Sequence, residues 1–76
     1  MKNVHSEVYK NLKFNISYAR KTQGLSQIKL AEKVGISGSY MSRIEAPNGD
    51  TVPSLAVIFD IANALDVSID KLFDFD

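Results

Sequence analysis

Cysteine is absent from the 76 residues, and so are the patterns that would commit the chain to a metal or a membrane. Without cysteine there is no disulfide framework, no thiolate nucleophile and no cysteine-bound zinc. The single histidine, His5, belongs to no H-E-x-x-H motif, and the acids form no D-x-D-x-D-G loop. No apolar run approaches the roughly 18 residues of a membrane span, and the start, MKNVHSEVYKN, lacks the apolar segment of a secretory signal. We therefore expect a cytoplasmic protein with no membrane association.

The same absences argue against an enzyme. There is no histidine–acid pair and no phosphate-binding loop, and 76 residues leave little room for a cleft. We expect no catalytic residues, no cofactor and no metal. The length instead allows one domain, residues 1–76, and 45% apolar residues are too many for a disordered chain.

Apolar residues recur at helical spacing, and glycines and turn residues separate the segments. This pattern predicts an all-α fold of five helices, because no segment alternates as a strand does. The helices are expected at about residues 7–22, 27–34, 38–45, 55–65 and 69–73. In the fourth, which Ser54 caps, the inward residues are expected to be Leu55, Ile58, Ile61, Ala62 and Leu65.

Three helix starts share one arrangement, in which a serine caps the helix between two apolar residues that can touch. The serines are Ser26, Ser37 and Ser68. The flanking pairs are Leu25 with Leu30, Ile36 with Met41, and Val67 with Leu72. Repeated capping of this kind fixes how the chain enters each helix.

Residues 26–45 are predicted to form a helix-turn-helix. Gly35 supplies the positive φ that a tight turn needs, and Ala31 is small enough for the two helices to cross closely. The second helix of such a unit can lie in the major groove of DNA, which is about 12 Å wide.

The exposed face of that second helix carries small polar residues and one arginine. A hydroxyl both donates and accepts, so it can meet several bases, and arginine matches the two acceptors of guanine. The face consists of Ser37, Gly38, Ser39, Ser42 and Arg43. The alternative is that Ser37 only caps the helix while Ser39 and Ser42 are only solvated. Tyr40 fits either a phosphate contact or packing on the preceding helix.

A net charge of zero conceals an asymmetry between the two halves of the chain. Residues 1–43 carry eight bases and two acids, and residues 44–76 carry one base and seven acids. The basic half favours a polyanion as partner, although two solvated faces of opposite sign would give the same counts. Lys13 and Lys21 are candidates for phosphate contacts.

The segment "GLSQIKLAEKVGISGSYMSRIE" resembles the helix-turn-helix of the lambda-repressor-like family, the Cro, phage-repressor and xenobiotic-response-element group. The resemblance extends over about residues 12–73, through the closing "SLAVIFDIANALDVSIDKLF". It implies a five-helix bundle that binds double-stranded operator DNA, in most members as a dimer.

The resemblance also implies roles for individual residues. Gln27 is expected to bond a phosphate and brace the recognition helix. Arg20 and Glu45 match a salt bridge that ties the first helix to the end of the third. The residues expected to meet bases most often are Gly38, Ser39 and Arg43.

Two departures from the family pattern imply fewer DNA contacts by one subunit. The loop "APNGDTVPS" has no base, and Gly38 replaces a side chain that often reads DNA. Dimerisation should then matter more, and a weak homodimer is expected. Its interface is expected to involve Val57, Phe59, Val67, Phe73 and Phe75.

The sequence therefore predicts a sequence-specific transcriptional regulator, a repressor that binds a near-palindromic operator as a dimer. The alternative is an antitoxin or another module that uses the same fold to hold a protein partner.

Overall fold

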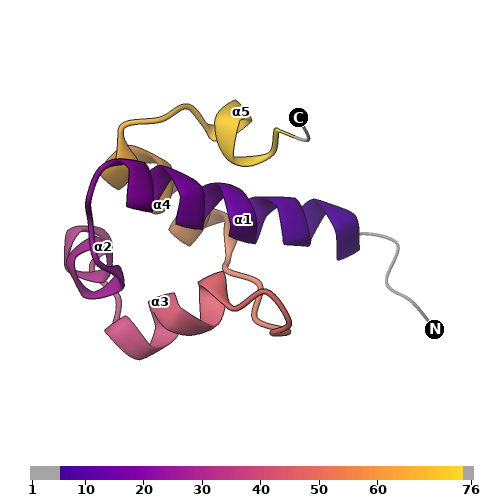
Figure 1. Ribbon diagram of the computed structural model, residues 1–76, viewed down its shortest axis with the longest axis horizontal. Coiled ribbons are helices and arrows are strands. Elements are labelled where there is room, and N and C mark those ends of the chain that lie inside the picture. Colours follow the sequence, from indigo (N-terminus) through magenta and orange to yellow (C-terminus); the bar gives the residue numbers. More distant parts are fainter. Residues whose placement is uncertain (1–5, 75–76) are drawn as a thin grey trace.

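The computed structural model describes residues 6–74, and every regular element among them is a helix. Figure 1 shows the helices packed into a single folded unit. They are α1 (Ser6–Thr22), α2 (Gln27–Val34), α3 (Gly38–Glu45), α4 (Leu55–Leu65) and α5 (Ile69–Leu72). The predicted all-α, five-helix fold is confirmed, with α1 one residue longer and α5 one residue shorter than expected.

Helix α1 joins the two sides of the bundle. It packs against α3, α4 and α5, while α2 packs against α3 and α4. Helices α3 and α5 lie on opposite sides of α1 in Figure 1, so α3 forms one edge of the molecule. The buried apolar side chains come from all five helices: Leu12, Ile16, Leu30, Ala31, Met41, Ile44, Ile58, Ile61, Ala62, Leu65 and Leu72.

Serine hydroxyls cap the three middle helices. Ser26 Oγ accepts from the Lys29 N–H at 3.0 Å, Ser37 Oγ from Tyr40 N–H at 3.0 Å, and Ser54 Oγ from Val57 N–H at 3.2 Å. Each bond satisfies one of the backbone donors that a helix start leaves open.

Ser68 takes the predicted cap position of α5, but the capping hydrogen bond predicted for its side chain is not formed. Ser68 has the extended backbone of a cap residue, with φ −73° and ψ 155°, but its hydroxyl accepts no capping bond. Helix α5 is a single four-residue turn, so the packing of its buried Leu72 holds it in place.

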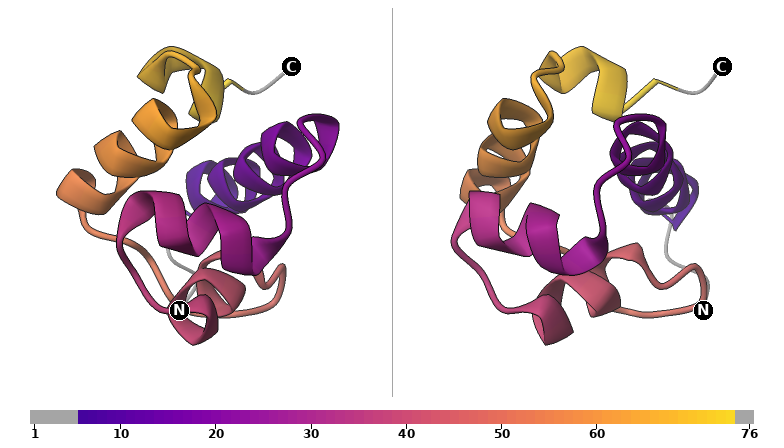
Figure 2. Two further views of the ribbon diagram at one scale, coloured as in Figure 1. Left: turned by 90° about the vertical axis from the view of Figure 1, so that its left-hand side faces the viewer. Right: turned by 60° about the vertical axis from the view of Figure 1, so that its left-hand side comes forward.

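The turn between α2 and α3 uses Gly35 in the left-handed region, with φ 88° and ψ 29°. Its N–H donates to the Ala31 carbonyl oxygen at 2.8 Å, and Ile36 N–H donates to the same oxygen at 3.0 Å. A side chain at Gly35 would be strained by this backbone whatever the space around it. The two views of Figure 2 show α3 leaving this turn and projecting at the edge of the bundle.

The inward placement of Leu55 is also wrong, since its side chain is 62% exposed. Leu55 is the first residue of α4, and it shares an outward face with Phe59 one turn later, which is 48% exposed. The other four predicted inward residues of α4 are buried. No helix within residues 6–74 has both the length and the apolar character needed to cross a membrane.

Candidate nucleic-acid interface

The outward face of α3 presents the polar residues that the sequence singles out. Ser37, Ser39, Ser42 and Arg43 are exposed, and Gly38 is half-buried. The opposite face of α3 is closed by the buried Met41 and Ile44. The helix therefore offers solvent a surface of hydroxyls and one guanidinium.

Arg43 lies back along this surface in the free protein. Its Nη1 donates to Ser39 Oγ at 3.2 Å, and its Cζ lies 5.8 Å from the centre of the Tyr40 ring. Tyr40 itself is half-buried and packs against the core. These contacts hold the guanidinium over α3 while leaving most of its N–H donors available.

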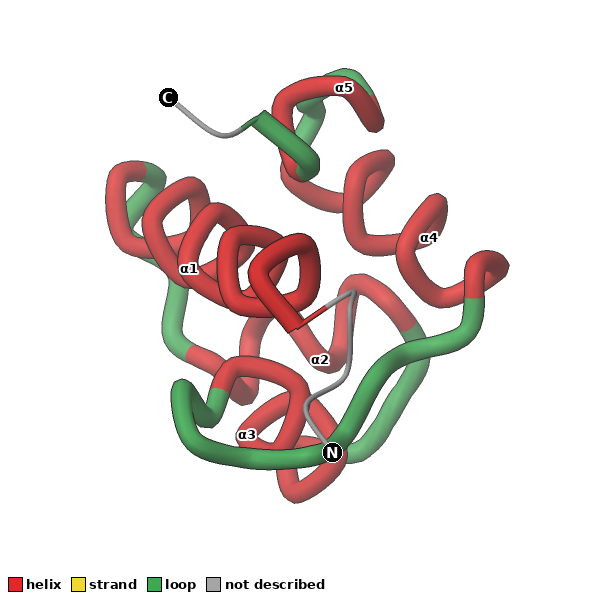
Figure 3. The backbone as a smooth tube through the Cα atoms, turned by 90° about the vertical axis from the view of Figure 1, so that its right-hand side faces the viewer, coloured by secondary structure: helices red, strands yellow, loops and turns green. Residues whose placement is uncertain are grey.

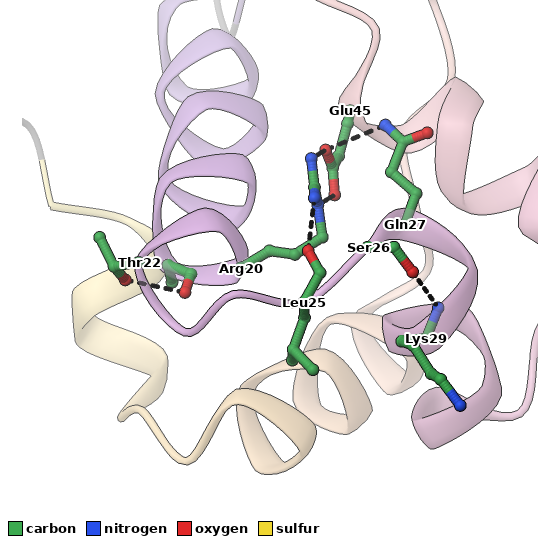
Figure 4. A network of polar contacts seen from close by, with 8 residues as sticks. Arg20, Thr22, Leu25, Ser26, Gln27, Lys29 and Glu45 are labelled. Atoms are coloured by element: carbon green, nitrogen blue, oxygen red, sulfur yellow. Dashed lines mark hydrogen bonds and ion pairs between the residues drawn. The ribbon is translucent and has the colours of Figure 1, made fainter.

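A buried ion pair joins α1 to the last residue of α3. Arg20 Nε donates to Glu45 Oε2 at 2.8 Å, and Arg20 Nη2 donates to Glu45 Oε1 at 2.9 Å. The two side chains are only 10% and 3% exposed. Arg20 Nη1 also donates to the Leu25 carbonyl oxygen at 2.7 Å, as Figure 4 shows. The pair expected from the sequence is present, and its two parallel bonds fix the angle between the helices.

Gln27 joins α2 to this network, which therefore links α1, α2 and α3. Its Nε2 donates to Glu45 Oε1 at 3.1 Å from the first position of α2 (Figure 4). Its side chain is half-buried. The bracing role expected of Gln27 is therefore present in the structure, whereas its phosphate contact stays a prediction.

Lys13 is buried and its donors are occupied within the protein, so its predicted phosphate contact is wrong. The residue is 5% exposed. Its Nζ donates to the carbonyl oxygens of Thr51 at 2.7 Å, Ile44 at 2.9 Å and Arg43 at 3.4 Å. An ammonium group has three N–H donors, so these oxygens occupy all of them.

The buried position of Lys13 affects its pKa, and its carbonyl partners show which elements it joins. Burial lowers the pKa of the Lys13 ammonium group, and the carboxylate of Asp50 acts in the opposite direction by raising it. Two of the three carbonyls belong to the last turn of α3, where helix carbonyls lack intrahelical partners. The third belongs to the loop between α3 and α4, which Figure 3 shows running across the molecule to the start of α4. Lys13 thus anchors both α3 and this loop to α1.

Lys21 is exposed, as a phosphate contact requires. It borders a surface hollow of about 800 Å³ between α1 and the end of α3. Lys10, Ser42 and Asn48 line the same hollow. Sequence reasoning did not select Lys10, because its nearness to α3 depends on how α1 crosses that helix. It did not select Asn48 either, although that residue lies in the loop directly after α3.

The hollow also has an aromatic wall that sequence reasoning did not assign to any site. Phe14 and Tyr18 are 66% and 62% exposed, and their rings stack with centroids 6.1 Å apart. Their spacing of four residues signals the contact, but it does not say which side of α1 faces water.

The residues expected at a dimer interface differ in exposure. Val57, Val67 and Phe73 are half-buried and pack against the core, whereas Phe59 is 48% exposed. Phe75 lies outside the described residues, as does His5. Within residues 44–74 the large apolar side chains that are exposed are those of Val52, Leu55 and Phe59. Among residues 6–74 no three metal-binding side chains gather.

Comparison with known proteins agrees with the helix-turn-helix that α2 and α3 form. The profile of the helix-turn-helix family matches residues 16–72. The chain belongs to this family, in its lambda-repressor-like branch. A relative, the transcriptional regulator SinR of Bacillus subtilis, is 42% identical over 59 residues, which are 78% of this chain and 52% of SinR. The chain therefore spans about half the length of SinR.

Two solved structures extend the family comparison. SinR in complex with DNA has a TM-score of 0.75 and 40% identity, covering 83% of this chain and 98% of that one. The restriction-modification controller protein C.AhdI of Aeromonas hydrophila has a TM-score of 0.78 and 32% identity, covering 86% and 96%. These relatives are regulators and not enzymes, as the sequence predicts for this chain.

Replacing Lys13 tests its structural role. Lys13→Met keeps most of the length of the side chain but leaves the carbonyls of Ile44 and Thr51 without their donor. We expect the free energy of unfolding in urea to fall by about 2–3 kcal/mol, because an unsatisfied buried acceptor costs about 1–3 kcal/mol. The exposed Lys21→Met is the matched control and should change it by less than about 0.5 kcal/mol. Equal, small effects of the two substitutions would contradict the anchoring role.

A double-mutant cycle tests the Arg20–Glu45 pair. Removing one partner should cost about 3–5 kcal/mol, because the other charge is left buried, and the double variant should recover part of that loss. The exposed pair Lys29 and Glu32, with 3.7 Å between Nζ and Oε1, is the control and should show coupling near zero. Additive losses at Arg20 and Glu45 would show that they do not interact. Urea denaturation of all variants provides the measurement.

Proposed function

We propose that this protein is a sequence-specific transcriptional regulator that places α3 in the major groove of double-stranded DNA. The observation that carries the proposal is the outward face of α3, with Ser39, Ser42 and Arg43 exposed on a helix anchored at its end by Glu45. A rigidly held helix with short polar side chains can bring those groups to base edges. The likeness to SinR in complex with DNA supports this role. Such a regulator acts in the cytoplasm.

Phosphate contacts would come from the residues around α3. Lys10 and Lys21 border the hollow beside the end of α3, together with Ser42 and Asn48. Gln27 keeps its second amide N–H without a partner among the described residues, which fits a phosphate oxygen at the start of α2. The loop between α3 and α4 offers no base, because Asp50 is its only charged residue.

A weak homodimer remains part of this proposal, and the centre of its interface moves from the expected residues to the exposed face at the start of α4. Leu55 and Phe59 lie one turn apart on the exposed face of α4, and Val52 is exposed just before the helix. Burying such side chains against a second copy would be favourable, since each contributes about 1.5–3 kcal/mol when fully buried. A two-fold dimer would space its recognition helices about 34 Å apart, one turn of DNA. The DNA target would then be a near-palindromic operator, and binding to it would repress transcription.

Protein binding is the second candidate function. The stacked Phe14 and Tyr18 are exposed beside Lys10 and Lys21, and this combination suits an acidic partner with apolar anchors. An antitoxin role would use this surface instead of α3. Selection of DNA sequences by the protein separates the two candidates.

Selection from a random pool of duplexes tests DNA recognition. We expect one preferred sequence at low salt and a steep loss of affinity as salt rises, because phosphate contacts release counterions. Arg43→Ala should cost about 1–3 kcal/mol and relax one base position, whereas Lys21→Ala should weaken all sequences alike. A protein that selects no sequence would contradict the proposal.

Cooperativity of binding tests the dimer. The double variant Leu55→Ser with Phe59→Ser removes exposed apolar groups without opening the core, so the fold should persist. We expect wild-type protein to bind a two-half-site operator cooperatively and the variant to lose that cooperativity. Phe14→Ser, which removes an exposed apolar side chain from α1, should keep the cooperativity of wild type, whatever its overall affinity. A wild-type footprint over one half-site, without cooperativity, would indicate a monomeric binder.

A further inference from the structure

Ile28 is an exposed isoleucine in the first turn of α2, with 65% of its surface open to solvent. It lies directly beside the start of α3. A Cβ atom built on Gly38, the first residue of α3, would be 3.4 Å from Ile28 Cγ1. The Ile28 side chain therefore lies over the place from which a side chain at position 38 would grow.

Single exposed apolar residues are common on protein surfaces and need no special role. Two features set Ile28 apart. Its Cγ1 would be in contact with the first atom of any side chain at position 38, so α2 supplies a side chain beside the place where Gly38 supplies none. It also follows Gln27, whose amide bonds Glu45 at the end of α3, so its backbone is fixed relative to α3.

The chemistry of isoleucine restricts what it can recognise. Its side chain has no hydrogen-bond donor or acceptor, and the apolar group that bases present in the major groove is the C5-methyl of thymine. Gly38 has no side chain, so the first position of α3 offers no group of its own beside Ile28.

We propose that Ile28 is a further specificity-determining residue, and that it contacts a thymine methyl at the base pair beside Gly38. This inference rests on the proposed function, since it requires α3 in the major groove. It assigns one base position of the operator to α2 and not to α3. The selected sequence should therefore carry a thymine in each half-site that no residue of α3 explains.

The test removes the methyl group without changing base pairing. Once wild-type protein has selected its operator, each thymine is replaced in turn by deoxyuridine. One replacement per half-site should weaken wild-type binding about fourfold, roughly the effect of exposing one methyl group. Ile28→Ala should bind the thymine and deoxyuridine operators equally, and its exposed position should leave thermal unfolding unchanged.

Leu55→Ala is the matched control, because Leu55 is nearly as exposed as Ile28 but lies on α4. It should retain the full effect of the deoxyuridine replacement, whatever its overall affinity. If every deoxyuridine replacement affects wild type and Ile28→Ala alike, the inference is overturned while sequence-specific binding stays intact. A uniform loss by Ile28→Ala on every duplex would overturn it too, since that result indicates a sugar or phosphate contact. Failure to select any operator would instead remove the proposed function itself.

Discussion

The orientation of α3 depends on buried cations of α1. An isolated helix of eight residues is only marginally stable in water, so α3 needs support from the bundle. Arg20 holds the carboxylate of Glu45 through two bonds, and Lys13 holds the carbonyls of the same last turn. Met41 and Ile44 add apolar packing beneath. A helix fixed in this way can present its outer residues at defined positions, which direct reading of bases requires.

This use of cations changes how the charge of the chain is interpreted. Eight bases occur in residues 1–43, but Lys13 and Arg20 are buried, where Lys13 bonds backbone carbonyls and Arg20 pairs with Glu45. Lys29 lies within 3.7 Å of the acid Glu32. The surface available to a polyanion is thus smaller than the count of bases indicates. A smaller basic surface on one subunit is consistent with the proposed dimer, in which two subunits share the contacts to DNA.

The sequence predicts best those features that depend on neighbours in the chain. The caps at Ser26, Ser37 and Ser54 and the positive φ of Gly35 are local, and they were predicted correctly. The Arg20–Glu45 pair came from family resemblance, since 25 residues separate its partners. Lys13 was misassigned because basic residues usually face water, and the carbonyls that bind it come from residues 43–51. Leu55 was misassigned because apolar spacing does not show where the core ends.

The two ends of α3 are therefore held by different means, and this separates stability from recognition. The C-terminal turn is held by charged groups from α1, while the N-terminal turn follows the Gly35 turn and is capped by Ser37. Neither anchor uses the side chains of Ser39, Ser42 or Arg43. Those residues can change without loosening the helix, because their bonds to the fold are few and exposed. Recognition can then diverge among proteins with this fold while the buried contacts that orient α3 stay the same.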